Sequence, residues 1–361
     1  MHSFDIKTKI YYGDGALDRL TQIPYKKVMI ITDPFVVQSG MVMMITSRLD
    51  EAKIEFEVFK DVVPDPPIDK VVAGVKAVMD YKPEAIVAVG GGSAIDSAKA
   101  MAYGAAEEGD VWDLYCGKRQ ARAALPVGAV LTIAAAGSEM SDSSVITNED
   151  GWIKRGYSSD LCRPVFAVMN PELTMTLPAY QTACGCTDIL MHTMERYFHP
   201  EAGMALTDSL AEALMRTVME SARVLTKEPE NYEARAEVMW AGSLSHNGLT
   251  GCGAGGDWMT HKLEHELGGL YDVAHGAGLA VVFPGWLRFM LQKPDKVMRL
   301  AQFAVRVWGC QMDFEHPEKT AQAGIDAYVA WLKGIGMPVT FGELGAREED
   351  IPYLAAKVKR P

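Results

Sequence analysis

Two pairs of potential metal ligands stand four residues apart in the C-terminal half of the chain. Asp188 precedes His192, His261 precedes His265, and a further histidine, His275, follows. Residues four apart share one face of a helix, so the two members of each pair would point the same way. One carboxylate with two or three imidazoles suits Zn²⁺ or Fe²⁺ and leaves a coordination position open for substrate. We therefore predict a divalent metal site among these five residues.

Two other interpretations of the sequence do not fit, a zinc peptidase motif and a thiolate metal site. HKLEH (261–265) resembles the H-E-x-x-H motif of zinc peptidases, but that motif needs its glutamate directly after the first histidine, where this chain has Lys262. The mismatch argues strongly against a peptidase. Cys184 and Cys186 are separated by one residue, which is not the two-residue spacer of thiolate metal sites, so we interpret them as structural.

A glycine-rich turn occupies the stretch AIVAVGGGSAIDSAKA (85–100). An apolar run ends at three glycines, and Ser93 with Asp96 three residues later has the pattern of a helix-capping box. The pattern predicts a helix that begins at the turn, where free backbone N–H groups can bind a phosphate. The turn is not a G-x-G-x-x-G fingerprint, so taken alone it fits a plain tight turn equally well.

Asp33 favours the phosphate interpretation. It ends the apolar run VMIITD (28–33), at the carboxyl edge where open α/β sheets bind ligands. A carboxylate there can accept hydrogen bonds from both ribose hydroxyls of an adenosine and would repel a 2′-phosphate, which favours NAD over NADP. The alternative is that Asp33 only caps a turn before Pro34.

The elements that position these residues change in character along the chain. The first half alternates strand-like and helix-like runs, which predicts a mostly parallel sheet covered by helices. The second half is helical in pattern, with Leu206, Leu210, Leu214 and Val218 spaced along one expected face. We predict an α/β, Rossmann-like domain over 1–176 and an all-helical domain over 177–361. The expected strands are 26–33, 54–62, 84–90 and 129–133; the expected helices are 41–52, 68–81, 93–106, 178–198, 205–225, 257–270, 295–309 and 320–338.

Composition excludes several classes of protein. The 361 residues are too many for one comfortable core, and the formal charge of −12 would repel nucleic acid and anionic membranes. No apolar stretch approaches the roughly 18 residues of a spanning helix. The start, MHSFDIKTKIYYGDG, lacks the pattern of a signal peptide, and the six cysteines are scattered. We therefore expect a cytoplasmic enzyme with small-molecule partners.

Several motifs together resemble one known family. GGGSAIDSAKA (90–100), DILMHTMERY (188–197) and HKLEHELGGLYDVAHGAGLAVVFP (261–284) look like the iron-containing, metal-dependent alcohol dehydrogenases. The resemblance covers essentially the whole chain. EGDVWDL (108–114) and AAAGSEMSDSSVITNED (134–150) look most like the butanol dehydrogenase branch. The N-terminal stretch is closer to the propanol and lactaldehyde reductases, a mixture that would suit a recombined or designed sequence.

This resemblance implies the fold of dehydroquinate synthase and the iron-containing alcohol dehydrogenases, with NAD(P) in a cleft between the two domains. Asp188, His192, His261 and His275 would hold the metal, Fe²⁺ or Zn²⁺. His265 would stand beside the nicotinamide as a proton-relay or positioning residue. The resemblance also assigns six positions to cofactor binding, with the glycine turn cradling the pyrophosphate: Asp33, Gly91, Gly92, Ser93, Thr132 and Lys154.

The implied function is reversible interconversion of short- to medium-chain primary alcohols and aldehydes, such as butanol and butanal, by a homodimer or larger oligomer that prefers NAD(H). The metal would act as a Lewis acid on the substrate oxygen, with Asp188, His261 and His265 as the catalytic residues. A glycerol or polyol dehydrogenase, or a dehydroquinate synthase-type enzyme, is an alternative within the same fold. A catalytically impaired protein that still binds NAD or metal is another.

The chain departs from the family pattern in two places. Ile133 and Ala136 stand where many members have threonines, so we expect some hydroxyl contacts to the cofactor to be lost. The chain also ends at AAKVKRP (355–361), sooner than the resemblance leads us to expect. A shorter end would weaken the helical domain or leave the cleft open.

Overall fold

The computed structural model describes residues 4, 6–199, 204–252, 256 and 258–358. The chain divides into two compact units: one comprises Asp5–Thr176, and the other comprises Leu177–Pro361 with Met1–Phe4. The first residue of the helix expected over 257–270 and the last three residues of the chain lie outside the described residues. None of the helices in the described part is long and apolar enough to cross a membrane.

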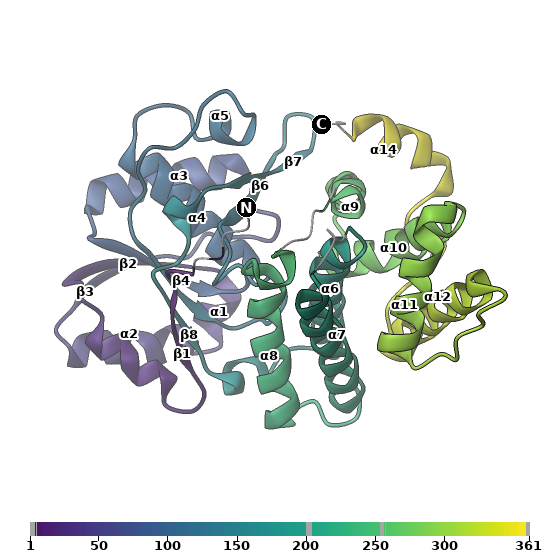
Figure 1. Cartoon of the computed structure of the whole chain (residues 1–361). Coiled ribbons are helices and arrows are strands. Elements are labelled where there is room, and N and C mark those ends of the chain that lie inside the picture. The colour runs from purple at the N-terminus through teal and green to yellow at the C-terminus, as the bar shows by residue number, and fades with distance from the viewer. Residues whose placement is uncertain (1–3, 5, 200–203, 253–255, 257, 359–361) are drawn as a thin grey trace. The chain divides into compact units, whose positions relative to one another are not determined.

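Six parallel strands form the main sheet of the α/β unit, in the order β1-β8-β5-β4-β2-β3 (Figure 1). Side chains alternate between its two faces: Val28 and Ile30 of β2 belong to one apolar cluster, and both neighbours, Met29 and Ile31, are also buried. Strands buried on both faces are typical of a parallel sheet covered by helices. The strands of this sheet are β1 (Lys9–Tyr12), β2 (Lys27–Thr32), β3 (Glu55–Phe59), β4 (Ala85–Gly90), β5 (Val127–Leu131) and β8 (Phe166–Met169).

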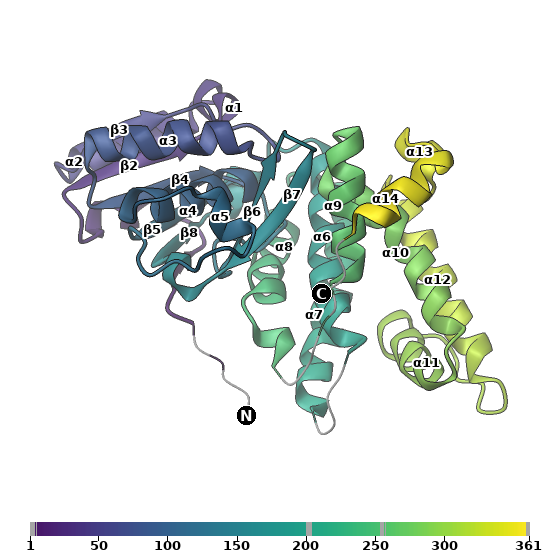
Figure 2. The same cartoon turned by 90° about the horizontal axis from the view of Figure 1, so that it is seen from above.

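Helices cover both faces of this sheet (Figures 1 and 2). Helices α3 and α4 pack together on one face, and α2 lies with a 3₁₀ helix at Ala16–Gln22 on the other. A separate antiparallel hairpin, β6 (Ser143–Asn148) and β7 (Ile153–Ser158), packs through β6 against α4. The α-helices of the unit are α1 (Pro34–Gln38), α2 (Met41–Glu51), α3 (Ile68–Tyr81), α4 (Gly92–Ala106) and α5 (Trp112–Tyr115), and further 3₁₀ helices are Asp160–Cys162 and Pro171–Thr174.

The described residues of the second unit contain helices and no strand. Helix α10 continues through Pro284. Helix α6 packs against α7, α8 and α10, and α9 packs against α10. The α-helices are α6 (Ala179–Tyr197), α7 (Ala205–Leu225), α8 (Tyr232–His246), α9 (Met259–Tyr271), α10 (His275–Leu291), α11 (Pro294–Trp308), α12 (Pro317–Gly334), α13 (Phe341–Leu344) and α14 (Ile351–Lys357); short 3₁₀ helices are Leu249–Gly251 and Glu348–Asp350.

The predicted fold class, a parallel α/β domain followed by a helical one, is confirmed. The predicted apolar face of α7 is partly wrong, because Leu206 is 73% exposed and Leu210 is 40% exposed, whereas Leu214 and Val218 are buried. Sequence reasoning did not predict strands β1, β6, β7 and β8, the long helices α8 and α10, or the short helices α1, α5, α13 and α14.

Candidate metal centre and nucleotide edge

Helix α6 carries the first two predicted ligands, Asp188 and His192, one turn apart. From Ala183 onward every residue of this helix is buried, so both side chains lie in the core of the helical unit. Asp188 is 3% exposed and His192 is 5% exposed. The i, i+4 spacing thus directs both ligands into the packed interior.

The other histidines lie around the junction of α9 and α10. His261 is the third residue of α9, and His275 is the first residue of α10. Asp272 adopts a left-handed conformation (φ 50°) and ends α9, so the chain turns between the two helices. Directly after His275, Gly276 packs on the backbone of α6 at Cys184.

Asp188 Oδ1 stands in the middle of three imidazoles. It is 3.6 Å from His192 Nδ1, 3.7 Å from His261 Nε2 and 3.6 Å from His275 Nε2. Asp188, His261 and His275 form a group whose ligand atoms all lie within 4.8 Å of one another. His192 contacts this group through Asp188 and is not a member of it by that distance.

These distances fit a divalent metal ion. Asp188 Oδ1 and His261 Nε2 are buried and have no hydrogen-bond partner among the described residues. Separations of 3.6–3.7 Å are too long for hydrogen bonds. Ligands about 2.1 Å from one tetrahedral ion lie about 3.4 Å from each other, close to what is observed. The donor set of one carboxylate and imidazoles suits Zn²⁺ or Fe²⁺.

The electrostatics of the cluster also favour a cation. Burial by itself would raise the pKa of Asp188, but the neighbouring imidazoles of His192, His275 and His261 outweigh it and hold that pKa below its ordinary value. Burial would lower the pKa of His261, but the carboxylates of Asp188 and Glu195 raise it to about 9. A proton is therefore held tightly at a place where a metal ion would supply the same positive charge.

Two buried glutamates near this cluster were not predicted as site residues. Glu195 contacts His261, and Glu264 contacts His275, each at the Nδ1 atom of the ring. The sequence does contain a signal for Glu195, because it follows Asp188 by two helical turns and so lies on the same face of α6. His265 forms a second close group with Glu264 and His275 and is partly buried.

The nucleotide candidates lie at the carboxyl edge of the parallel sheet. Thr32 of β2 pairs in register with Val89 of β4, so Asp33 and Gly90 emerge side by side. A Cβ atom placed on Gly90 would be 3.7 Å from Asp33 Oδ2. Thr132, which follows β5, donates its backbone N–H to Gly90 O at 3.1 Å. The topology therefore brings Asp33, the glycine turn and Thr132 to one place.

The turn itself differs from the predicted capping box. The N-cap of α4 is Gly91, with no side-chain cap. Asp96 instead accepts hydrogen bonds from Ser138 Oγ at 2.6 Å and Val145 N at 3.0 Å, so its predicted capping role, and that of Ser93, is wrong. The first backbone N–H groups of α4 therefore lack a side-chain acceptor, which leaves the helix start suited to an anion.

The two positions that depart from the family pattern pack directly on this turn. A Cβ atom on Gly91 would lie 3.0 Å from Ile133 Cβ, and one on Gly92 would lie 3.4 Å from Ala136 Cβ. Packing alone therefore accounts for a glycine at position 91. Lys154 belongs to β7, is 5% exposed, and its Nζ is 2.6 Å from Asp65 Oδ1.

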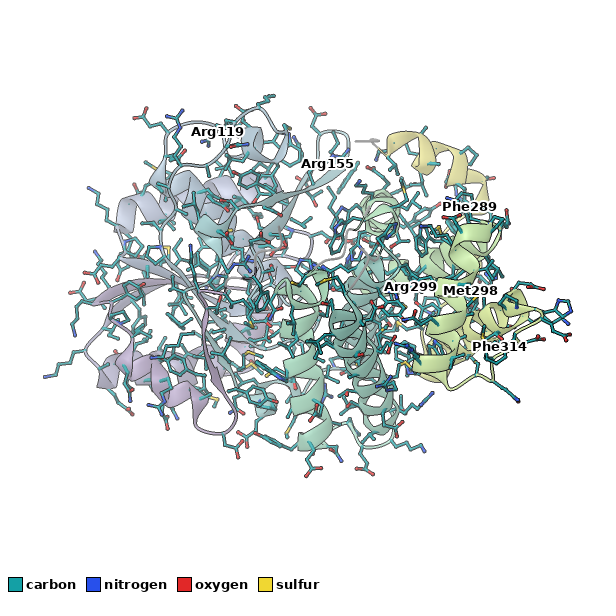
Figure 3. The ribbon with its side chains drawn as sticks, in the orientation of Figure 1. Arg119, Arg155, Phe289, Met298, Arg299 and Phe314 are labelled. Carbon is teal, nitrogen blue, oxygen red and sulfur yellow. The ribbon has the colours of Figure 1, made fainter. Side chains whose placement is uncertain are left out.

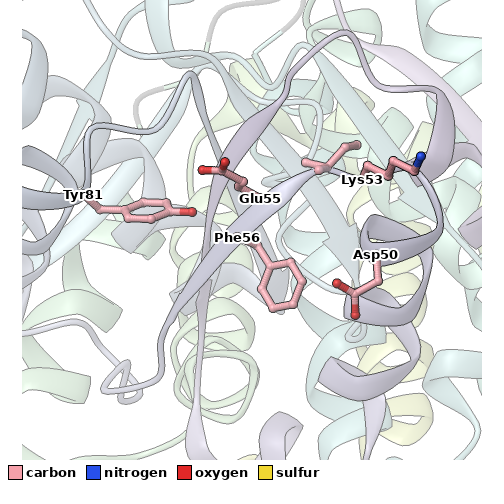
Figure 4. A pocket seen from close by; sticks show the side chains of 6 residues that line it. Asp50, Lys53, Glu55, Phe56 and Tyr81 are labelled. Atoms are coloured by element: carbon pink, nitrogen blue, oxygen red, sulfur yellow. The ribbon is translucent and has the colours of Figure 1, made fainter.

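Two hollows lie away from the predicted residues. In the α/β unit, a hollow of about 500 Å³ is lined by Asp50, Lys53, Glu55, Phe56 and Tyr81, with Ile54 (Figure 4). It adjoins the start of β3, which pairs with the start of β2, so it lies at the opposite end of the strands from Asp33. In the helical unit, a hollow of about 700 Å³ adjoins residues 272–274, before His275, and contains no histidine.

A glycine turn at the carboxyl edge of a parallel sheet and a buried Asp–His cluster in a helical unit are features of a metal-dependent oxidoreductase. Residues 7–171 match the family described as iron-containing alcohol dehydrogenase. Residues 182–360 match the C-terminal region of the Fe-containing alcohol dehydrogenase family. The chain belongs to this family, whose members use a divalent metal and a nicotinamide cofactor to interconvert alcohols and aldehydes.

Similar proteins cover nearly the full length of the chain. A probable NADH-dependent butanol dehydrogenase of Bacillus subtilis is 36% identical over 97% of this chain and 91% of that protein. An NADPH-dependent aldehyde reductase of Escherichia coli is 34% identical over 99% of this chain and 93% of its own length. The crystal structure of a butanol dehydrogenase from Thermotoga maritima, described as NADH-dependent, has a TM-score of 0.95 at 36% identity, covering 99% of this chain and 90% of that one.

Proposed function

We propose that this protein is a metal-dependent, NAD(H)-preferring dehydrogenase that interconverts short- to medium-chain primary alcohols and aldehydes, with butanol and butanal among its substrates. The observation that carries the proposal is the cluster of Asp188, His261 and His275, in which the first two residues are buried and His275 is partly buried. Support for the substrate class comes from the relatives described as butanol dehydrogenases. In this proposal the α/β unit binds the dinucleotide and the helical unit holds the metal.

Asp188, His192, His261 and His275 would hold the metal. When bound, the ion supplies Lewis acidity that lowers the pKa of an alcohol and polarises an aldehyde. Asp188 contributes the negative charge that offsets the ion, and the imidazoles contribute neutral nitrogen ligands. His265 is partly buried, its ring lies 5.7 Å from the ring of His275, and we assign it the movement of the substrate proton to solvent.

The dinucleotide would lie at the carboxyl edge of the sheet. Gly91, Gly92 and Ser93 begin α4, where backbone N–H groups can hold the pyrophosphate. One carboxylate oxygen of Asp33 accepts a hydrogen bond from Val36 N at 2.9 Å, and the other oxygen faces the glycine turn. That oxygen can accept from a ribose hydroxyl and would repel the 2′-phosphate of NADP. Thr132 and Lys154 are assigned to the same site.

The test pairs metal analysis with a substrate panel. The purified protein is expected to contain about one divalent metal per chain and to oxidise NADH faster than NADPH with butanal, propanal, lactaldehyde and dihydroxyacetone. Asp188→Ala should lose the metal and the activity together, whereas removal of metal by a chelator should abolish activity reversibly. Full turnover by metal-free protein would refute the proposal. Faster turnover of dihydroxyacetone than of butanal would instead favour a glycerol dehydrogenase.

A further inference from the structure

Glu195 of α6 and Glu264 of α9 each place a carboxylate oxygen at the Nδ1 atom of a different histidine of the cluster. Glu195 Oε1 is 3.2 Å from His261 Nδ1, and Glu264 Oε2 pairs with His275 Nδ1. Both glutamates are 0% exposed. In both histidines the other ring nitrogen, Nε2, faces Asp188 Oδ1. The arrangement carboxylate, imidazole, central aspartate therefore occurs twice in one site.

We propose that Glu195 and Glu264 are positioning residues that hold His261 and His275 as Nε2 ligands of the metal. The inference rests on the proposed function, because it takes Asp188 and the two histidines as ligands. A neutral imidazole carries a single N–H, and a carboxylate at Nδ1 keeps the proton on that atom. The lone pair of Nε2 then points at the ion, and the ring becomes a more basic ligand with a fixed orientation.

Glu195 is itself held by the start of α9. Its Oε1 atom accepts from the Thr260 hydroxyl and from the backbone N–H of His261, the latter at 3.4 Å. Glu195 and Asp188 lie on one face of α6. In this proposal a single helix therefore supplies both a metal ligand, Asp188, and the residue that positions a second ligand, His261. Glu195 therefore fixes His261 by its ring and by its backbone.

Glu264 occupies space that the neighbouring helix leaves free. A Cβ atom on Gly278 of α10 would lie 2.8 Å from Glu264 Cγ and 2.9 Å from Glu264 Oε1. Only glycine at position 278 leaves room for this carboxylate in its present place. Burying a carboxylate away from water is costly unless a positive charge offsets it. A metal held by His275 would supply that charge.

A second ion between Glu264, His265 and His275 is the competing explanation of these contacts. Their ligand atoms lie within 4.8 Å of one another. His275 Nε2, however, faces Asp188 Oδ1 at 3.6 Å, and a neutral imidazole that binds a metal through Nε2 carries its proton on Nδ1, so Nδ1 cannot bind a second ion. The geometry therefore favours a positioning role for Glu264 over a second metal site.

Zn²⁺ affinity of the metal-free protein, measured by competition with a chromophoric chelator, tests the inference. Glu195→Gln and Glu264→Gln keep the shape but remove the charge, and each should weaken Zn²⁺ binding by about 10- to 100-fold. The visible spectrum of the Co²⁺-loaded variants should also change. Glu266→Gln is the control. Glu266 lies on α9, as Glu264 does, is 1% exposed and pairs with Lys357 at 3.1 Å. It should leave Zn²⁺ affinity within twofold of the parent.

A second kind of variant displaces the Glu264 carboxylate without removing it. Gly278→Ala pushes the Glu264 carboxylate from its place and should also weaken Zn²⁺ binding tenfold or more, with Gly285→Ala, where an added Cβ meets open space, as its control. If a glutamine variant does not fold, Gly278→Ala and the remaining glutamine variant decide the question. Parent-like Zn²⁺ affinity in folded Glu195→Gln and Glu264→Gln overturns the inference. A parent protein that binds no Zn²⁺, or an Asp188→Ala variant that binds it equally well, overturns the proposed function and this inference with it.

Discussion

Gly276 offers a way to move one metal ligand without replacing any. It follows His275 in α10 and lies against the backbone of α6. A Cβ atom at position 276 would be 2.1 Å from Cys184 O and 2.7 Å from Cys184 C and Cα. These are backbone atoms, so no change of side-chain rotamer relieves the overlap. Gly276→Ala should therefore force the start of α10 away from α6.

The size of the displacement follows from the contact. The Cβ atom must retreat by about 1 Å to reach the 3.0–3.4 Å range of tight packing. Cys184 lies one turn before Asp188, and Gly276 follows His275. The shift should therefore lengthen the distance between Asp188 Oδ1 and His275 Nε2, which is 3.6 Å in the parent. Metal–ligand distances tolerate only about 0.2 Å. We expect Zn²⁺ affinity and kcat/KM each to fall by roughly 100-fold.

The assays are Zn²⁺ competition, NADH oxidation with butanal, and thermal unfolding with and without metal. Overpacking should also destabilise the metal-free protein by about 1–3 kcal/mol. Gly285→Ala in the same helix is the matched control, since its Cβ would meet nothing within 4 Å. It should bind Zn²⁺ normally and gain up to about 1 kcal/mol of helix stability. A folded Gly276→Ala variant with parent-like Zn²⁺ affinity would show that the interhelical contact does not set the ligand geometry.

Two further substitutions test the cofactor edge and an ion pair of the helical unit. Asp33→Asn keeps a side-chain acceptor for Val36 N but removes the negative charge. The ratio of kcat/KM with NADPH to kcat/KM with NADH should therefore rise by roughly tenfold. An unchanged ratio would show that Asp33 does not select the cofactor. Burial alone would raise the pKa of Asp208, but hydrogen bonds from Arg299, a residue labelled in Figure 3, hold that pKa below its ordinary value. This carboxylate therefore stabilises the fold above its unfolded pKa, and the contribution is lost as pH falls through its folded pKa. Asp208→Asn should lower Tm by about 2–4 °C at pH 7, and the difference from the parent should shrink near pH 3.

Spacing along a helix was enough to predict that Asp188 and His192 face the same way. Asp188 and His192 are one turn apart in a helix predicted over 178–198 and found at Ala179–Tyr197. The alternation of strands and helices likewise predicted a parallel sheet, and the pairing of β2 with β4 brings Asp33 and Gly90 to its carboxyl edge. In the first case a helical turn fixes the geometry, and in the second the common direction of neighbouring parallel strands does, although Asp33 and Gly90 are 57 residues apart in the sequence.

Long-range contacts explain what sequence reasoning missed. Asp96 matches a capping box by spacing, yet its carboxylate accepts from Ser138 and Val145, which are 42 and 49 residues away. Leu206 has the correct period for the buried face of α7, but it is exposed because the buried face runs through Thr207, Ala211, Met215 and Val218. Periodicity gives the faces of a helix, and only the packed neighbours determine which face is covered.

The α/β unit and the helical unit differ in how far protein atoms compensate their buried charges. A buried charge that protein atoms fully compensate is structural, whereas one that they leave uncompensated indicates a binding site. Lys99 is fully buried in the α/β unit, and its Nζ contacts five oxygen atoms of Ser138, Ser141 and Ser143 at 2.7–3.2 Å. Protein atoms alone satisfy that charge, so nothing further is needed there.

The carboxylates of the helical unit are not satisfied in this way. Asp188 Oδ1, Glu195 Oε2 and Glu264 Oε1 are buried without a hydrogen-bond partner among the described residues. The groups that face these side chains include imidazoles, which are neutral when they bind a metal. Buried carboxylates are costly without a positive charge. A cation bound at the Asp–His cluster would supply it, so metal binding should stabilise the helical unit as well as provide the catalytic centre.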